Sequence, residues 1–496
     1  MRPELIIGLV GPIGCHIEAV QAQIVAALNG VGYTTKAISI SEDMAKLSEA
    51  KLGKRPKLAS WEDKISAGND VRRAYSNNGI LAAHAITRIR ELRKAIHCES
   101  GRPHAEDFDP ANTLADSAAF IIRQFKRPEE IQLMRKTYKS AFIQISINQD
   151  RQSRLDNLIN QLKKDSEPHH GAIADKAEKL IYQDENEDSD DFGQRLTDIF
   201  HLADVFIDGK NAAATSERFI HALFGRNNIA PTKDELGSYL AKSAALRSVD
   251  LSRQVGAAIL SPEGDVITIG CNEVPKPGGG NYWDEDDDKK RDIDKGSEPN
   301  KKEINRIIHD FLGILSKHGA LHDNKKPDEL LKNKKLSNAI HRSMIGEITE
   351  YGRIVHAEMN AISDAARLGR SIKNATLYVT TFPCHNCAKH IIAGGIARVV
   401  FIEPYPKSRT KLLYGDLVAI DSEQPGNAET GKVNFVHFAG IAPSRFLSIF
   451  EKSRRCHQET GIIEDWHEGE RRPRIGDQEL NYTESELHAI YDNFPA

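Results

Sequence analysis

Short apolar runs alternate with helix-like patterns through the first 230 residues of the chain. Residues 5–10 are aliphatic apart from one glycine, and further glycines follow them. Apolar side chains recur every three to four positions over residues 17–28, which predicts a helix, and residues 34–40 have the pattern of a second strand. Because strands that alternate with helices favour a parallel sheet, we expect a doubly wound α/β domain over residues 1–230.

The apolar pattern changes after a polar linker near residue 230. Residues 255–260 and 266–270 are strand-like and are joined by a turn that contains proline and glycine, which predicts a hairpin. Strand-like runs return at residues 376–381 and 399–402, each with a helical pattern beside it. We therefore expect a second α/β domain over residues 231–450, with a mixed sheet between layers of helices.

A long polar excursion interrupts this second domain. Residues 273–352 include three consecutive glycines and the charged run at 284–302, and only residues 303–315 have the spacing of an amphipathic helix. We interpret residues 273–352 as an insertion and residues 451–496 as a C-terminal tail.

Composition places the chain among ordinary globular proteins. It has 496 residues and a mass of 55.2 kDa, with 40% hydrophobic and 28% charged residues, which suggests two or three domains. The formal net charge of −4 gives no general basic field, so nucleic-acid binding would need a local patch. No apolar run reaches the roughly 18 residues that span a bilayer, and most of the six cysteines are isolated. We expect a soluble, cytoplasmic protein with no membrane partner and no disulfide framework.

The loop after the first strand lies where phosphate-binding loops lie, and its glycines are Gly11 and Gly14. The phosphate-binding pattern ends in glycine, lysine and a hydroxyl residue, whereas this chain has His16, Ile17 and Glu18 there. Because the lysine and hydroxyl hold the phosphates and Mg²⁺, we expect no phosphoryl transfer. Two alternatives stay open: Gly11 and Gly14 bind a regulatory nucleotide or another effector without hydrolysis, or the loop is only a connecting turn.

Two arginines, Arg151 and Arg154, follow the strand predicted near residues 141–147. This order resembles the nucleotide-kinase branch of the P-loop proteins, in which an arginine-bearing helix follows a later strand. The resemblance implies a degenerate P-loop fold for residues 1–230. We expect this domain to regulate the protein or to assemble subunits.

Three residues of the second domain have the types and spacing of a zinc site. His356 precedes a helical pattern, and Cys384 and Cys387 follow the strand at residues 376–381. Three protein ligands leave a fourth position for water, which is typical of catalytic zinc. Helix N-termini favour thiolate over thiol, and zinc needs the thiolate. The sequence therefore predicts one catalytic Zn²⁺ held by His356, Cys384 and Cys387.

Glu358 lies two residues after His356 and is the candidate catalytic residue. In the first turn of a helix both side chains can face a metal in front of the helix end. Zinc lowers the pKa of its water toward ~7, and an unligated carboxylate beside it can carry protons. The combined H-x-E and P-C-x-x-C pattern is the signature of zinc deaminases.

On these motifs, residues 236–446 resemble the deoxycytidylate deaminase branch of the cytidine deaminase superfamily. The sequences RQVGA at 253–257 and GCN at 270–272 resemble family motifs, although Cys271 replaces an aromatic residue. The resemblance implies a cytidine-deaminase-like α/β/α fold and a contact between Asn272 and the sugar of the substrate.

The layout of the whole chain resembles bacterial anti-phage dCTP deaminases, and EPYPKS at 403–408 and FAGIAP at 438–443 fit that group. The resemblance implies hydrolysis of deoxycytidine nucleotides, with dCTP favoured, to deoxyuridine nucleotides, and depletion of dCTP in antiviral defence. A housekeeping dCMP deaminase that supplies dUMP is the alternative. A nucleic-acid cytidine deaminase has the same zinc motif but needs a strand-binding surface that the net charge of −4 opposes.

Two further residues are candidates for substrate binding. Ala357 lies between the metal ligand and Glu358, and we expect it to line the substrate site. Lys407 follows a strand of the same domain and could meet substrate phosphates, although a solvated surface charge explains it equally well. The insertion could cover the site as a lid or make a subunit contact, and we expect a homo-oligomer.

Overall fold

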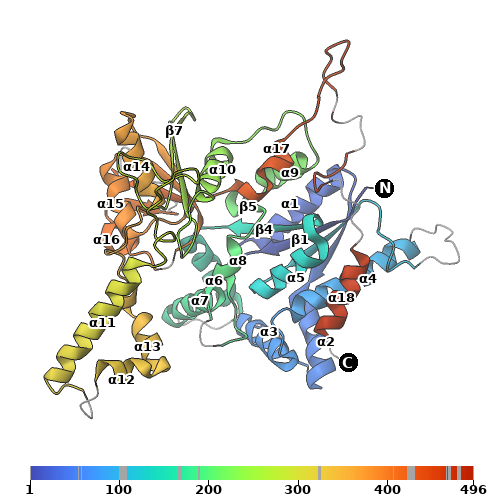
Figure 1. The fold of residues 1–496 in the computed structure, drawn as a ribbon. Helices are drawn as coiled ribbons and strands as arrows, with labels where there is room; N and C mark the ends of the chain where they lie inside the picture. The colour runs from blue at the N-terminus through green and yellow to red at the C-terminus, as the bar shows by residue number, and fades with distance from the viewer. Residues whose placement is uncertain are drawn as a thin grey trace.

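The structure is a computed structural model that holds two six-stranded sheets side by side, each with its own helices (Figure 1). It describes residues 2–494 except 54, 57, 100–108, 166–169, 188–189, 322–325, 406, 422–430, 465, 467–470 and 477–481. The fold is mixed α/β, as the sequence pattern predicts.

The first sheet has the strand order β12-β5-β4-β1-β3-β2, and its first five strands in the sequence run parallel. The strands are β1 (Leu5–Val10), β2 (Thr34–Ser39), β3 (Ala118–Arg123), β4 (Phe142–Asn148), β5 (Val205–Asp208) and the antiparallel β12 (Gly440–Ile441). All six residues of β1 are buried, because β1 lies at the centre of the sheet between layers of helices.

Helices connect and cover these strands. They are α1 (Ile17–Gly30), α2 (Ile40–Leu52), α3 (Trp61–Tyr75), α4 (Ile80–Glu99), α5 (Pro128–Tyr138), α6 (Arg151–Asp165), α7 (His170–Glu185), α8 (Leu196–Phe200) and α9 (Ala212–Leu223). The helix predicted over residues 17–28 is α1, and it buries Ile17, Val20, Ile24 and Leu28 on one face. The apolar spacing therefore predicted this helix correctly.

The second sheet has the order β10-β11-β9-β8-β6-β7. Its strands are β6 (Gly256–Leu260), β7 (Val266–Cys271), β8 (Thr376–Thr381), β9 (Arg398–Glu403), β10 (Val418–Ile420) and β11 (Val433–His437). The predicted hairpin is β6–β7, which is antiparallel, whereas β8, β9, β11 and β10 run parallel to one another. The helices α10 (Lys233–Ala245), α14 (Ala357–Arg367), α15 (His385–Ala393) and α16 (Thr410–Tyr414) belong to this sheet.

The insertion forms a helical arm. It contains α11 (Pro299–Lys317), α12 (Pro327–Lys332) and α13 (Lys334–His341), and these helices extend away from both sheets (Figure 1). The helix predicted over residues 303–315 lies within α11 and buries Ile304, Ile308 and Leu312 in a small core of the arm. The second part of the insertion is therefore a folded element, whereas most of the charged run at 284–302 lies before α11.

The C-terminal residues return to the first sheet. Strand β12 pairs with β5, and the helix α17 (Phe446–Phe450) packs near α9. The helix α18 (Thr483–Asn493) packs against α4 and α5, where Figure 1 shows it in red beside the blue N-terminal helices. The residues that we interpreted as a tail, 451–496, thus contribute the helix α18 to the N-terminal half, and β12 and α17 lie just before them.

Among the described residues, no helix combines the length and apolar character that a membrane span requires.

Candidate metal and active site

His356 lies directly before helix α14, at its N-cap position, with extended backbone angles (φ −63°, ψ 153°). The first turn of α14 lies close against strand β7 at Gly270. A Cβ atom at Gly270 would lie 2.5 Å from the carbonyl oxygen of Ala357, so only glycine permits this approach. The strand therefore fixes the position of the helix end that carries His356 and Glu358.

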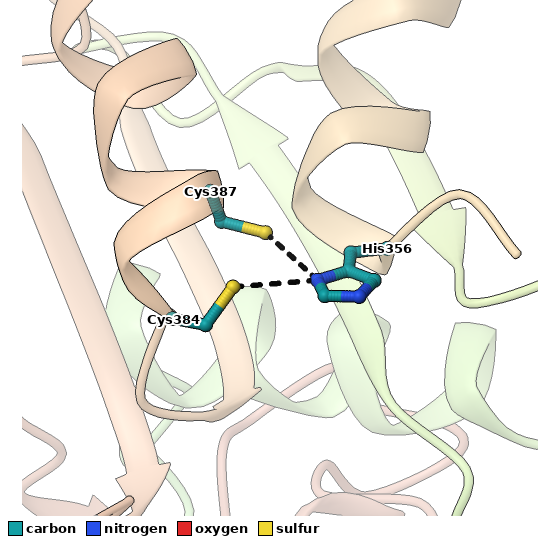
Figure 2. Close-up of side chains that lie close together, drawn as sticks. All are labelled: His356, Cys384 and Cys387. Carbon is teal, nitrogen blue, oxygen red and sulfur yellow. Dashed lines mark hydrogen bonds between the residues drawn. The ribbon is translucent and has the colours of Figure 1, made fainter. Parts of the chain in front are cut away.

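Cys384 and Cys387 lie at the start of helix α15. Cys384 is the N-cap residue, and Cys387 is in the first turn and fully buried. Both sulfur atoms face the His356 ring: the Sγ atoms of Cys384 and Cys387 lie 3.4 Å and 3.3 Å from His356 Nδ1. Figure 2 shows the three side chains pointing toward one another from the ends of two helices. The structure thus brings together the three predicted ligands.

The geometry of these atoms suits a zinc ion. The ligand atoms of the three residues all lie within 4.8 Å of one another. Typical Zn–S and Zn–N bond lengths at a tetrahedral angle separate sulfur and nitrogen by about 3.6 Å. The observed Sγ–Nδ1 distances are close to this value. The donor set of two thiols and one imidazole therefore fits zinc in type and in spacing.

Without a bound cation, the Cys384 side chain favours the thiolate and the Cys387 side chain favours the neutral thiol. Hydrogen bonds from Cys387 and His356 lower the pKa of Cys384 to about 3, whereas hydrogen bonding to Cys384 and burial raise the pKa of Cys387. The hydrogen bond with Cys384 also raises the pKa of His356. A second negative charge beside the Cys384 thiolate is unfavourable without a cation, and a divalent ion would compensate both thiolates.

Glu358 occupies the second position of α14 and is only 4% exposed. Burial raises the pKa of its carboxyl. Glu358, His356 and Cys384 line one cavity of about 480 Å³, so a ligand in the cavity can reach both the metal ligands and the carboxyl. This is the arrangement that general acid–base chemistry beside a metal needs.

The three predicted substrate contacts, Asn272, Ala357 and Lys407, also line this cavity. The side-chain amide of Asn272 is already engaged: Nδ2 donates to Asp250 Oδ2 (3.0 Å) and to the carbonyl of Arg253 (2.9 Å), and Oδ1 accepts from Val255 N (2.7 Å). Asn272 therefore orders the loop at residues 250–255. Its contact with a sugar stays a prediction.

The wall of the cavity also includes residues that the sequence did not indicate as site residues, namely Asp250 and the end of the insertion at Glu347 and Glu350. Arg409, which like Lys407 follows β9 and is a candidate for binding substrate phosphates, lines it as well. The Nζ atom of Lys407 lies 3.2 Å from Glu347 Oε1, so the insertion contacts a predicted substrate residue. The polar composition of the insertion gives no signal of this contact, because it depends on how the arm folds back.

Gly11 and Gly14 lie outside this cavity, in the loop between β1 and α1. Gly14 has φ +83°, and a Cβ atom there would lie 2.4 Å from the Arg154 carbonyl oxygen, so the glycine serves a close approach of helix α6. The loop amide of Ile13 donates to Asp184 Oδ2 (2.7 Å), and Lys126 Nζ donates to Asp184 Oδ1 (2.7 Å). The amide of Ile13 is therefore already bonded to a carboxylate of the chain itself. Nucleotide binding at Gly11 and Gly14 stays a prediction.

Comparison with known proteins gives partial matches. Residues 231–403 match the family model for the cytidine and deoxycytidylate deaminase zinc-binding region. Deoxycytidylate deaminase of Enterobacteria phage T2 is 49% identical over 69 residues, which are 14% of this chain and 36% of that protein. Human deoxycytidylate deaminase is 43% identical over 54 residues, 11% of this chain and 29% of that protein. The chain spans about a third of the length of the first of these relatives.

Solved structures match a larger share of this chain than the curated relatives do, but their similarity is weak. The dCMP deaminase from the cyanophage S-TIM5 in complex with dCMP and dUMP is 16% identical, with a TM-score of 0.23, over 42% of this chain and 99% of that chain. The similarity to this family therefore rests on the sequence match and on the motif residues within it. Residues 231–403 are similar to the zinc-binding region of cytidine and deoxycytidylate deaminases.

Proposed function

We propose that this protein is a zinc-dependent hydrolase that converts deoxycytidine nucleotides to deoxyuridine nucleotides and ammonia. The observation that carries the proposal is the group of three zinc-type ligands, two of which line a cavity together with the buried carboxyl of Glu358. The family match of residues 231–403 and the printed names of the relatives support the same chemistry.

His356, Cys384 and Cys387 would hold the zinc ion, which when bound supplies an activated water nucleophile. Glu358 accepts one proton from the attacking water and delivers it to the ring nitrogen of cytosine, and it then carries the second proton of the attacking oxygen to the leaving amino group. Burial of Glu358 excludes bulk water from this proton transfer. The products are one uracil ring and one ammonia for each water consumed.

We favour dCTP as the substrate, because three cationic side chains, Arg253, Lys407 and Arg409, line the cavity and can meet several phosphate charges. Together with the chain-wide resemblance to anti-phage enzymes, this supports a role in antiviral depletion of dCTP. The second candidate is dCMP, which is favoured by relatives named deoxycytidylate deaminase. Asn272 and Ala357, which line the same cavity, would contact the sugar and the base side of the substrate.

We further propose that the N-terminal half regulates the deaminase and that the protein acts as a homo-oligomer. The chain keeps a complete five-stranded parallel layer there, without the lysine and hydroxyl that phosphoryl transfer requires. An effector that binds to this half is the simplest use of such a domain.

One assay tests the activity. The zinc-loaded protein is incubated with dCMP, dCDP, dCTP, CTP and single-stranded DNA, and ammonia release is measured. We expect turnover of deoxycytidine nucleotides, fastest with dCTP, and none with DNA. Turnover of dCMP above dCTP at every concentration would establish the dCMP alternative, and turnover of DNA alone would contradict both. Glu350→Gln, which alters an exposed wall residue of the same cavity, is the matched control for loss of Glu358.

A further inference from the structure

The helical arm has a second apolar face beside the one that forms its core. Ile307, Phe311 and Ile314 of α11 are four and three positions apart, so they form one stripe along the helix. Phe311 and Ile314 are 51% and 50% exposed and are the large apolar residues of this helix that lie open to solvent. The stripe is therefore an apolar surface that the described chain leaves uncovered.

The arm gains little stability from its own core. Within the described part of the arm, the buried apolar residues are Ile304, Ile308 and Leu312, all on α11, and the helices α12 and α13 contribute none. Folded units with so small a core usually gain stability from a partner surface. Because the arm extends away from both sheets, neither sheet covers it (Figure 1). The stripe is thus free to pack against a partner.

A second copy of the chain offers a matching surface, because the stripe can pair with itself. In a two-fold dimer each residue of one helix faces a fixed residue of the other, and the same contact occurs twice. An antiparallel pair of α11 helices with its axis between residues 312 and 313 places Phe311 opposite Ile314 of the second copy. The two exposed apolar side chains of each helix then cover those of the other. Alternating spacing of three and four residues is also the pattern of helices that pack side by side in coiled coils.

The charges beside the stripe match in the same register. Asp310 and Lys317 both flank the stripe on the side away from the arm core, because each residue turns the helix by about 100°. Both side chains are exposed, and they lie two helical turns apart. In the antiparallel pair, Asp310 of each copy therefore lies beside Lys317 of the other copy. This arrangement gives two ion pairs across the interface.

The charge pattern also selects one register. A shift by two helical turns would place the Asp310 carboxylates of the two copies next to each other, and like charges at an interface are unfavourable. A parallel pair would bring Asp310 beside the apolar side of the other helix near Leu315 and not beside a cation. The antiparallel pair with its axis between residues 312 and 313 is therefore the arrangement in which the apolar and the charged contacts agree.

We propose that the arm binds the arm of a second copy of this chain as an antiparallel two-fold pair, through Ile307, Phe311 and Ile314 and through two Asp310–Lys317 ion pairs. The pairing gives a surface and a partner to the proposed homo-oligomer, on which it rests. The contact between two single helices is small, so we expect an equilibrium that depends on the protein concentration.

The base of the arm belongs to the wall of the active-site cavity. Asn300 Nδ2 of α11 donates to the Ile348 carbonyl (2.8 Å), and both residues line that cavity. Glu347, which pairs with Lys407, is the neighbour of Ile348 in the sequence. Arm pairing therefore restrains the wall that faces the substrate. Because an ordered wall loses less freedom when the substrate binds, we expect kcat/KM for deamination to rise with the protein concentration.

The mass of the full-length, zinc-loaded protein in solution tests the pairing. Phe311→Ser and Ile314→Ser alter exposed side chains, so the fold of the chain should not depend on them. At concentrations at which the wild type is fully assembled, we expect sedimentation velocity to show half of the wild-type mass for each variant. The matched control is Leu52→Ser, which alters a leucine that is 49% exposed at the end of α2 and should assemble like the wild type. Arm variants that also assemble like the wild type would overturn the proposal.

An exchange of charges tests the register. Asp310→Lys places a cation beside Lys317 of the other copy and should weaken assembly at least tenfold. The double variant Asp310→Lys/Lys317→Asp should restore assembly, because it exchanges the two charges of each ion pair. The control Glu329→Lys makes the same change of charge on α12, away from the stripe, and should have no effect. A double variant that assembles no better than Asp310→Lys would contradict the register and the proposal.

A measurement on the unaltered protein covers the case in which a variant does not fold. Peptides of α11 should exchange their amide hydrogens at least threefold more slowly at high than at low protein concentration, and equal exchange would contradict the pairing. A wild type that is monomeric at every concentration would overturn both the arm pair and the proposed homo-oligomer, whereas assembly that survives the arm variants overturns the arm pair alone. Ammonia release is measured separately. If no substrate is deaminated, the proposed activity fails, and the mass and exchange results still decide the arm pair.

Discussion

At the scale of single residues, the metal centre depends on two sulfur atoms and one ring nitrogen within 4.8 Å of one another. We expect Cys384→Ser and Cys387→Ser to lose the bound zinc, because a serine hydroxyl is a much poorer zinc ligand than a thiolate. Metal content is measured by elemental analysis. Cys98→Ser, which alters an exposed cysteine, should retain about one zinc per chain. Full zinc content in both site variants would contradict the assignment.

Glu358 tests the chemistry separately from the metal. Glu358→Gln keeps the size and burial of the side chain but cannot accept a proton, so we expect normal zinc content and a kcat lower by ~10²–10⁴-fold. Ammonia release and elemental analysis on the same preparation check both statements. The control Glu350→Gln should keep most of the activity. A Glu358→Gln protein with wild-type turnover would exclude the catalytic role.

His437 gives a prediction on stability. Burial lowers the pKa of His437 to about 4, whereas an unfolded histidine titrates near ~6.5. Between these values the unfolded chain binds a proton that the folded protein does not, so the free energy of unfolding falls as the pH falls, by up to ~3 kcal/mol. His437→Phe, which keeps a ring beside Phe401, should lose less stability from pH 7 to pH 4.

The measurement for His437 is denaturant unfolding of both proteins across this pH range. The neighbouring Asp421, whose Oδ1 accepts from the His437 amide, has its pKa raised by burial to about 6 and shifts stability in the opposite direction. Asp421 is present in both proteins, so the comparison isolates His437. Equal pH dependence of the two proteins would contradict the prediction.

At the scale of elements, helix starts position the chemistry. His356 and Cys384 are both N-cap residues, and the sequence pattern located their helices to within a few residues. The apolar positions of α15 begin at Ala388, whereas the helix itself begins at His385. The apolar pattern does not show this first turn, because its residues are the polar ones around the metal ligands. Tertiary packing of both helix ends on the second sheet decides that first turn.

The insertion and the strand ends meet at Lys407. Because Lys407 pairs with Glu347 at the active-site cavity, we expect Glu347→Gln to lower KM for dCTP and Lys407→Ala to raise it about tenfold, with a smaller change for dCMP. Steady-state kinetics with both nucleotides checks this. Lys389→Ala, on the exposed side of α15, should leave KM unchanged. Equal effects of Lys407→Ala on both nucleotides would remove Lys407 from triphosphate recognition.

At the scale of the whole molecule, the last helix closes the first half of the chain. Arg93 is fully buried and is held by Glu4 (2.8 Å) and by Glu486 of α18 (2.7 Å), and Arg90 also pairs with Glu486. Glu486→Gln leaves these two arginines with one carboxylate, so we expect a loss of about 3 kcal/mol in the free energy of unfolding. Denaturant unfolding measures it. Glu484→Gln, on an exposed position of the same helix, should cost little, and equal stabilities of the two variants would contradict the role of the network.

The same contacts bear on the division of the chain. Strand β12, which follows residue 230, pairs with β5 of the first sheet, and Glu235 of α10 forms an ion pair with Arg218 of α9. Contacts between the two halves of the chain therefore cross residue 230. The domain boundaries at residues 230 and 450 therefore stay predictions from the sequence. A cavity between the two sheets depends on this arrangement, because each sheet supplies only one of its walls.

The sequence by itself determined the alternation of helices and strands, the zinc-type motif and the degenerate glycine loop. The helices, the strands and the glycine loop depend on residue types within a few positions of one another, and so does each half of the zinc motif, so local spacing encodes them. The tertiary structure alone decided that Asp184 reaches the Ile13 amide, that the insertion reaches Lys407 and that Arg154 lines one cavity with Phe401 of the other sheet. Ile13 and Asp184 are 171 residues apart. Contacts over such separations arise from the packing of buried surfaces, which no local pattern specifies.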